Sequence, residues 1–196
     1  QALTGKRSFS FKVDKSPANL ALTDKLLATL DPSMPAELPL YSTNLRNAKL
    51  TIQQVAPSDW PAFYQAIQKL RQEHYDPKKP LQLPGKLLSK QTLTIKDQTD
   101  TLITTPIALG QWLKEGKFGH LLVLVEAGEA TVKPTNNDSP LQPQLVWVQG
   151  TQLSLDAYSY PDKILAWGGD LLTAKPVSNL ALSLHSSTSP TTQTQT

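Results

Sequence analysis

Short runs in which apolar and polar residues alternate recur along most of this chain. In the segment from Gln144 to Leu184, for example, Leu153, Leu155 and Ala157 are each separated by one polar residue. Alternation places successive side chains on opposite faces of a strand, and turns about 8–12 residues apart are typical of a β-sandwich. The pattern predicts a mostly β fold, an antiparallel β-sandwich. Strands are expected over 7–13, 38–44, 49–55, 90–96, 119–127, 145–148, 153–157, 163–172 and 179–184, a strand or short helix over 20–30, a loop over 81–88, and a strand followed by a turn over 101–113.

One stretch has helical spacing instead. Trp60, Phe63, Ile67 and Leu70 follow one another at intervals of three, four and three residues, which forms a single apolar stripe on a helix. One inserted helix is therefore predicted near 58–72, packed on a sheet edge or at a domain junction. Its stripe can serve as a partner-binding surface, but such a stripe normally faces the core of its own domain, and we expect that here.

Two other segments carry information about burial. The run from Gly119 to Ala127 is almost continuously apolar, which predicts a strand buried on both faces. Trp147 and Trp167 have apolar neighbours, so both are expected in a core rather than on a sugar-stacking surface. The pair Gly168-Gly169 within a strand-like run fits a bulge or a close approach of two backbones.

The order of these runs predicts parts of three domains. The strand with Phe9 and Phe11 has no partner of its own, and a lone strand is not stable. Only about four strands follow residue 143, whereas a sandwich needs about seven. With no initiator Met, the chain is expected to be an excised fragment whose targeting segment lies upstream. The predicted parts are 1–17 (closing strand of a preceding domain), 18–134 (a complete sandwich), 135–143 (linker), 144–185 (first strands of a following domain) and 186–196 (flexible tail).

Composition narrows the classes of function. The 196 residues carry a net charge of only +3, and Lys and Arg are dispersed, so no basic stripe for nucleic acid is present. The absence of cysteine excludes disulfides, thiolate nucleophiles and Cys-based zinc sites from this segment. Apolar runs stay well below the roughly 20 residues that span a bilayer.

The histidines are too dispersed for a metal or catalytic site. His74, His120 and His185 lie far apart in sequence, and none stands beside a carboxylate at ligand spacing. His74 is expected to be solvated at a helix end, and His120 to begin a buried strand.

The paired carboxylates favour turns over chemistry. Asp97 and Asp100 flank a turn-like Gln-Thr, and Glu126 and Glu129 flank Ala-Gly after a strand. Such side chains stabilise turns more often than they act as acids or bases. We therefore predict no catalytic, cofactor-binding or metal-binding residue, no cofactor, and no enzymatic activity.

Several motifs together resemble the bacterial alpha-2-macroglobulin family. The sequence of residues 144–184 is similar to the start of a macroglobulin-like domain: QLVWVQGTQLSLDAYSYPDKILAWGGDLLTAKPVSNLALSL. The stretch PIALGQWLKEGKFGHLLVLVEAG is similar to the end of one, and RSFSFKV to the closing strand of another. Two departures are Ala174, where the family usually has Gly before Lys-Pro, and Phe118-Gly119-His120, which replaces Gly-x-Tyr. The family's thioester motif is absent.

This resemblance implies macroglobulin-like, fibronectin-type-III-like sandwiches that act as scaffold. It implies that the full-length protein traps proteases in the periplasm or cell envelope, with target proteases and neighbouring macroglobulin-like domains as partners and a lipoprotein anchor as a possible attachment. The alternative is an adhesion or carbohydrate-binding module of a surface protein, since one fold hosts many functions.

Overall fold

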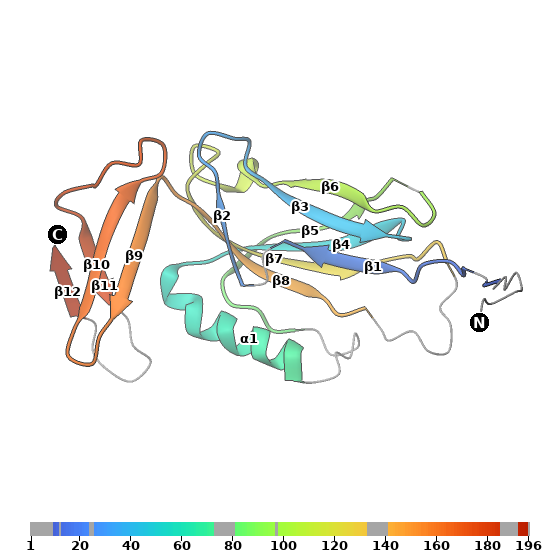
Figure 1. The fold of residues 1–196 in the computed structure, drawn as a ribbon, viewed down its shortest axis with the longest axis horizontal. Coiled ribbons are helices and arrows are strands. Elements are labelled where there is room, and N and C mark those ends of the chain that lie inside the picture. The colour runs from blue at the N-terminus through green and yellow to red at the C-terminus, as the bar shows by residue number, and fades with distance from the viewer. Residues whose placement is uncertain are drawn as a thin grey trace, which may run out of the picture.

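A computed structural model of the chain describes residues 10–11, 13–23, 26–72, 81–96, 98–132, 141–184 and 192–195. Two sheets stack on one another, and one helix covers the outer face of the larger sheet (Figure 1). The smaller sheet has three antiparallel strands. In spatial order these are β1 (Asn19–Leu22), β3 (Glu37–Thr43) and β6 (Ile103–Ala108).

The larger sheet has five strands and one parallel pairing. Strands β2 and β8 run parallel, and all other neighbours are antiparallel. This arrangement confirms the predicted mostly β sandwich with one helix. In spatial order the strands are β2 (Leu27–Leu30), β8 (Gln144–Gly150), β7 (Gly119–Ala127), β4 (Asn47–Gln54) and β5 (Lys86–Thr94).

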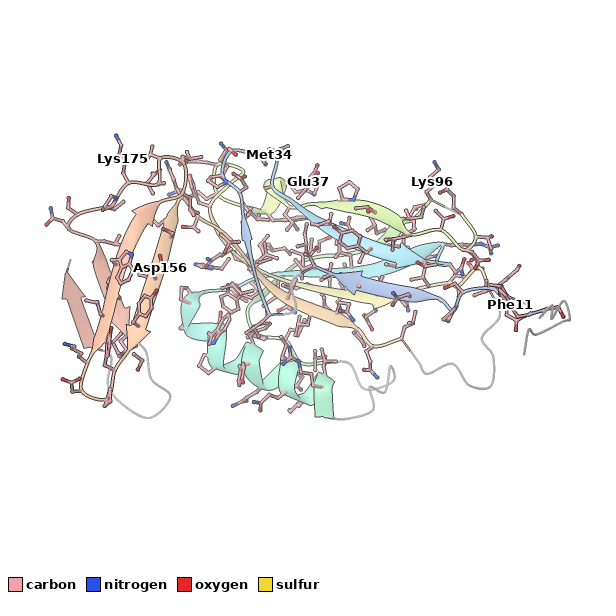
Figure 2. All side chains as sticks on the ribbon, in the orientation of Figure 1. Phe11, Met34, Glu37, Lys96, Asp156 and Lys175 are labelled. Carbon is pink, nitrogen blue, oxygen red and sulfur yellow. The ribbon has the colours of Figure 1, made fainter. Side chains whose placement is uncertain are left out.

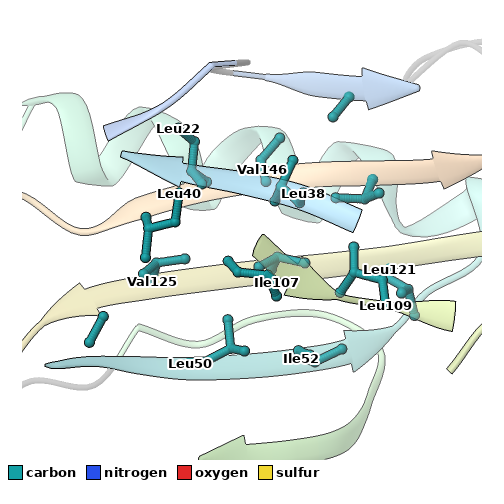
Figure 3. Close-up of a cluster of buried hydrophobic side chains, with 14 of the residues drawn as sticks. Leu22, Leu38, Leu40, Leu50, Ile52, Ile107, Leu109, Leu121, Val125 and Val146 are labelled. Atoms are coloured by element: carbon teal, nitrogen blue, oxygen red, sulfur yellow. The ribbon is translucent and has the colours of Figure 1, made fainter. Parts of the chain in front are cut away.

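The main core lies between the two sheets. Alternate residues of β4 and β7 point into it, and they meet the inward residues of β3 and the C-terminal half of β6 (Figure 3). Period-two alternation directs every second side chain of both sheets into this core. The inward side chains are almost all branched aliphatic. Its most buried members include Leu38, Leu40, Leu50, Ile52, Ile107, Leu121, Val123, Val125 and Val146.

The helix α1 (Trp60–Gln72) forms a second core on the opposite face of the five-stranded sheet. Phe63 and Ile67 are buried against Leu122, Leu124 and Trp147. The apolar stripe therefore faces the protein's own core, as predicted, and β7 is buried on both faces, as predicted. The helix lies across the face of the sheet rather than at its edge or at a domain junction, which corrects that part of the expectation (Figure 1). Short 3-10 turns, η1 (Pro57–Asp59) and η2 (Gly110–Trp112), precede α1 and β7.

The strand Gln144–Gly150 belongs to the first unit. The sequence placed it at the start of a following domain, but it pairs with β7 along its whole length and with β2 on its other side. Four of its residues are buried in a row, because one face meets the inter-sheet core and the other meets α1. The boundary therefore lies after Gly150 rather than before Gln144.

A second, smaller unit lies beyond one end of the sandwich (Figure 1). Strands β9 (Leu153–Ser159) and β10 (Ile164–Asp170) form an antiparallel ribbon. Strand β11 (Ala181–Leu184) pairs with β12 (Thr192–Gln195), so part of the predicted flexible tail is a strand. The remainder of that tail lies outside the described residues.

Three further predictions concern where individual elements begin and end. The segment 20–30 forms two strands, β1 and β2, and β5 begins at Lys86 inside the predicted loop 81–88. The predicted strand 7–13 lies mostly outside the described residues, and residues 10, 11 and 13 are not in a strand. The predicted linker 135–143 is described only from residue 141 onward.

Candidate functional site

A polar cluster closes the end of the sandwich away from the second unit. Asn44 is 2 % exposed, and its Nδ2 donates to the Ser16 carbonyl at 2.7 Å and to the Asp100 carboxylate at 2.9 Å. Its Oδ1 accepts the Asp100 backbone N–H at 2.7 Å, and its own carbonyl accepts from Thr131 N–H at 2.9 Å. We call these four residues the Asn44 clasp. The Asp100 carboxylate accepts hydrogen bonds from the distant Ser16 N–H and Asn44 side chain, so it joins separate segments of the chain rather than its own turn.

The other candidate acids and histidines do not gather. Glu129 forms an exposed ion pair with Arg46 at 2.8 Å, and Glu126 lies at the end of β7. Asp97, His74 and His185 lie outside the described residues. Among the residues that the structure describes, no three His, Cys, Asp or Glu side chains are placed to share a metal ion.

His120 is the one described histidine. It lies half-buried on β7, and its Nδ1 accepts a hydrogen bond from Trp147 Nε1 at 3.2 Å. Burial lowers the pKa of the His120 imidazole, because desolvation disfavours the charged form. Trp147 in turn packs edge-on against Trp60 at 5.2 Å and Phe63 at 5.5 Å between ring centroids.

One face of the β9–β10 ribbon is mostly apolar and largely exposed, with Ser159 and Asp170 on it at the two ends. Cross-strand register places Leu155 opposite Gly168, and Ala157 opposite Ala166, with Ile164 farther along the same face. Leu155 is 60 % exposed and Ile164 is 50 % exposed. A small two-stranded ribbon with such a face is not stable by itself in water, so this side requires a covering layer. We call it the apolar face; its residues are Leu153, Leu155, Ala157, Ile164 and Ala166.

The opposite side of the ribbon, the aromatic face, carries Asp156, Tyr158, Leu165 and Trp167. Asp156 is labelled in Figure 2. The rings of Tyr158 and Trp167 stack, with centroids 5.3 Å apart. Trp167 is 44 % exposed, so the prediction that it lies in a core of the second unit is wrong. Trp147 is buried as predicted, at 2 % exposed, but in the core under α1 of the first unit rather than in the second. The error arises because the apolar neighbours of Trp167 alternate between two faces, both of which are open here.

The turn after β10 is organised by Asp170. Its carboxylate accepts hydrogen bonds from the N–H and hydroxyl of Thr173, which hold the pKa of Asp170 below its usual value. Ala174 follows with φ of 56°, a left-handed conformation that favours glycine. The departure from glycine noted in the sequence thus falls on a backbone position that strains alanine. Val177 N–H donates to the Gly168 carbonyl at 3.0 Å and Gly169 forms a bridge with Pro176, which is the predicted close approach of two backbones; a Cβ at Gly168 would also overlap the Leu180 side chain.

The end of β8, where the chain leaves the first unit, is tightly packed against the turns of that unit. Gly150 ends β8 directly against the turn before β7, where an added Cβ would overlap the Lys117 carbonyl oxygen. The Lys117 Nζ reaches across to the Pro32 carbonyl at 3.0 Å, which joins this turn to the turn after β2. Sequence reasoning found neither contact, because no local signal marks a glycine that is needed for long-range packing.

These features favour a role in packing domains together. In the described part of the chain, both faces of one ribbon expose large apolar or aromatic side chains, and the ribbon follows the last strand of the sandwich directly. None of the described helices is long and apolar enough to cross a bilayer.

Neither a protein-family model nor a curated protein matches this sequence. Solved structures do match in fold. The crystal structure of native alpha-2-macroglobulin from Escherichia coli spanning domains NIE-MG1 is similar with a TM-score of 0.60 and 15 % identity, over 91 % of this chain and 82 % of that one. The structure spanning MG0-NIE-MG1 gives 0.56 and 14 %, over 96 % of this chain and 57 % of that one.

The native conformation of the same E. coli protein, determined by cryo-EM, gives a TM-score of 0.53 and 16 % identity, over 91 % of this chain and 11 % of that one. This chain thus has the fold of an early two-domain segment of E. coli alpha-2-macroglobulin, and it spans only a small part of that whole protein. The macroglobulin-like fold expected from the sequence motifs is confirmed.

Proposed function

We propose that this chain is a scaffold segment of a bacterial alpha-2-macroglobulin-like protease inhibitor of the cell envelope. Its immediate partners are neighbouring macroglobulin-like domains, and it meets target proteases only through the full-length protein, which a lipoprotein anchor would hold at the membrane. The segment carries out no chemistry of its own. The observation that carries this proposal is the fold shared with the NIE-MG1 segment over 91 % of the chain.

The architecture suits a scaffold. The sandwich has two cores, one between the sheets and one under α1, so it is a rigid body. The apolar face of the ribbon supplies the surface that further strands or a neighbouring domain would cover. Burying its large aliphatic side chains is worth about 1.5–3 kcal/mol each, which is enough to hold adjoining domains in a fixed relation.

A trapping assay with the full-length protein tests the proposal. Trapping blocks the cleavage of a large protein substrate while leaving the cleavage of a short peptide intact. The substitution pair Leu155→Asp and Ile164→Asp on the apolar face should abolish trapping, whereas Gln91→Asp on the exposed strand β5 should not. Full-length protein that protects no protein substrate would refute the inhibitor role, and inhibition by this segment alone would refute the scaffold role.

The aromatic face favours one alternative, an adhesion or carbohydrate-binding module. Exposed tryptophan and tyrosine rings can stack on the apolar faces of sugars, and Asp156 beside Trp167 could accept hydroxyl hydrogen bonds. Glycan-array binding that is lost in Trp167→Ala, with no protease trapping by the full-length protein, would support this alternative over the scaffold.

A further inference from the structure

His120 lies where the sheet meets the start of helix α1. It shares one face of the sheet with Leu122 and Leu124, which pack under the helix, and register places it opposite Gln149 of β8. From this position Nδ1 accepts the indole N–H of Trp147 at 3.2 Å, and the two ring centroids are 5.7 Å apart. Because Nδ1 is the acceptor, the neutral ring carries its proton on Nε2.

Trp147 is the contact through which His120 reaches the helix. Trp147 is 2 % exposed, and its indole contacts both Trp60 and Phe63. The ring centroids of Trp60 and Phe63 are themselves 5.1 Å apart. Such aromatic contacts are worth about 0.5–1.5 kcal/mol each beyond the burial of area. The orientation of this one indole therefore decides how the first turns of α1 pack on the sheet.

The surroundings of His120 contain no compensating charge on the same face of the neighbouring strands. Strand β8 presents Gln149, which bonds to Thr29 of β2 at 3.0 Å, and strand β4 leads to Val55. Helix α1 presents Trp60 and Phe63.

The nearest charged groups on the adjoining elements are engaged elsewhere. Asp59, just before α1, accepts the Ala56 N–H at 2.9 Å, and Lys117, in the turn before β7, donates to Pro32. Lys90 faces the helix side from β5, with β4 between it and β7. Among the described residues no carboxylate forms an ion pair with His120, and burial alone accounts for the lowering of its pKa.

We propose that His120 and Trp147 form an acid-sensitive latch for helix α1. A proton from solvent binds Nδ1 and turns it from an acceptor into a donor, so that two N–H groups face each other. The buried indole N–H loses its acceptor, which is costly away from water. The indole shifts, its contacts with Trp60 and Phe63 loosen, and the start of the helix detaches from the sheet.

The direction with pH follows from the burial of His120. In the folded chain the pKa of His120 is lowered below the unfolded value of 6.5. At a pH below 6.5 the unfolded or opened chain therefore binds more protons than the native chain. The latch is closed above the unfolded pKa, and its stabilisation is lost as the pH falls through the folded pKa.

Hydrogen exchange on the full chain tests the latch. Between about pH 8 and about pH 5, and after correction for intrinsic exchange, protection of the α1 amides should fall by up to about tenfold for each unit of difference between the open and closed pKa values. Protection in β3 and β4 should hold. Tryptophan fluorescence should report the same transition, with a single midpoint below the unfolded value of 6.5.

Two variants assign the transition. His120→Gln cannot be protonated and should remove the acid transition, whereas the double variant His74→Gln, His185→Gln, which leaves His120 in place, should keep it. A transition that persists in folded His120→Gln, or vanishes in the double variant, overturns the proposal. Wild-type chain whose α1 protection is flat across this pH range overturns it as well, and that result depends on no variant.

Discussion

Replacing Asn44 by alanine is expected to destabilise the sandwich by about 4–5 kcal/mol. The side chain makes three short hydrogen bonds, at 2.7, 2.7 and 2.9 Å, one of them to the Asp100 carboxylate. Neutral bonds contribute about 1 kcal/mol each, and a bond to a charged group contributes somewhat more. Asn44 also has φ of 55°, and alanine pays about 1 kcal/mol there that asparagine largely avoids.

A second substitution at the same position separates the two contributions. Asn44→Gly loses the same bonds but adopts the left-handed conformation freely, so it should cost about 1 kcal/mol less than Asn44→Ala. Urea unfolding followed by circular dichroism gives both free energies, and unchanged slopes would show that the unfolded states are comparable.

The control is Asn19→Ala, which removes a single local bond at the start of β1 and should cost less than about 1 kcal/mol. The reasoning about the Asn44 clasp fails if Asn44→Ala loses no more than this control. It fails in its conformational part if the alanine and glycine variants unfold at the same urea concentration.

Three further substitutions probe the strained and crowded positions. Ala174→Gly should stabilise the second unit by about 0.5–1 kcal/mol, because glycine adopts the left-handed conformation without strain. Ala166→Gly, in strand β10, should destabilise the same unit. Hydrogen exchange of the ribbon amides measures both changes, and equal shifts in the two variants would contradict this prediction. Gly150→Ala should destabilise the sandwich by about 1–3 kcal/mol, because the added methyl group meets the Lys117 carbonyl. An unchanged melting temperature would show that the end of β8 packs less closely on the Lys117 turn than described. Ser42→Ala should be neutral or stabilising by up to about 1 kcal/mol in the same melting assay, since the buried Ser42 hydroxyl has no hydrogen-bond partner among the described residues. A clear loss of stability would reveal a bond that these residues do not show.

Patterns that depend on neighbouring residues were predictable from the sequence. The stripe on α1 and the alternation in β4 are local periodicities, and a short, nearly continuous apolar run such as β7, bounded by Gly residues, favours a strand covered on both sides. These elements form the centre of the fold, so its class could be predicted with them.

Pairing between distant segments was not predictable. The run in β8 looks the same whether it opens a new domain or completes an existing sheet, and only its partners β7 and β2 decide between these. The Asn44 clasp joins residues 28 to 87 positions apart, and Gly150 meets a turn more than thirty residues earlier. No periodicity encodes such contacts, although an asparagine in a turn-like Ser-Thr-Asn segment was a weak local signal for the clasp.

The position of β8 also determines how the protein would bear a load. The chain leaves the sandwich through this strand and continues directly into the ribbon, so tension from the second unit pulls β8 along its own axis. Its hydrogen bonds to β7 and β2 are then strained together, in shear, instead of opening one after another from the end. A strand at an edge of the sheet would resist the same force with the hydrogen bonds of one neighbour only, whereas β8 has two. The second unit is thus tied to the mechanically strongest part of the first, and a pull on it moves the sandwich as a whole before it unravels the sandwich.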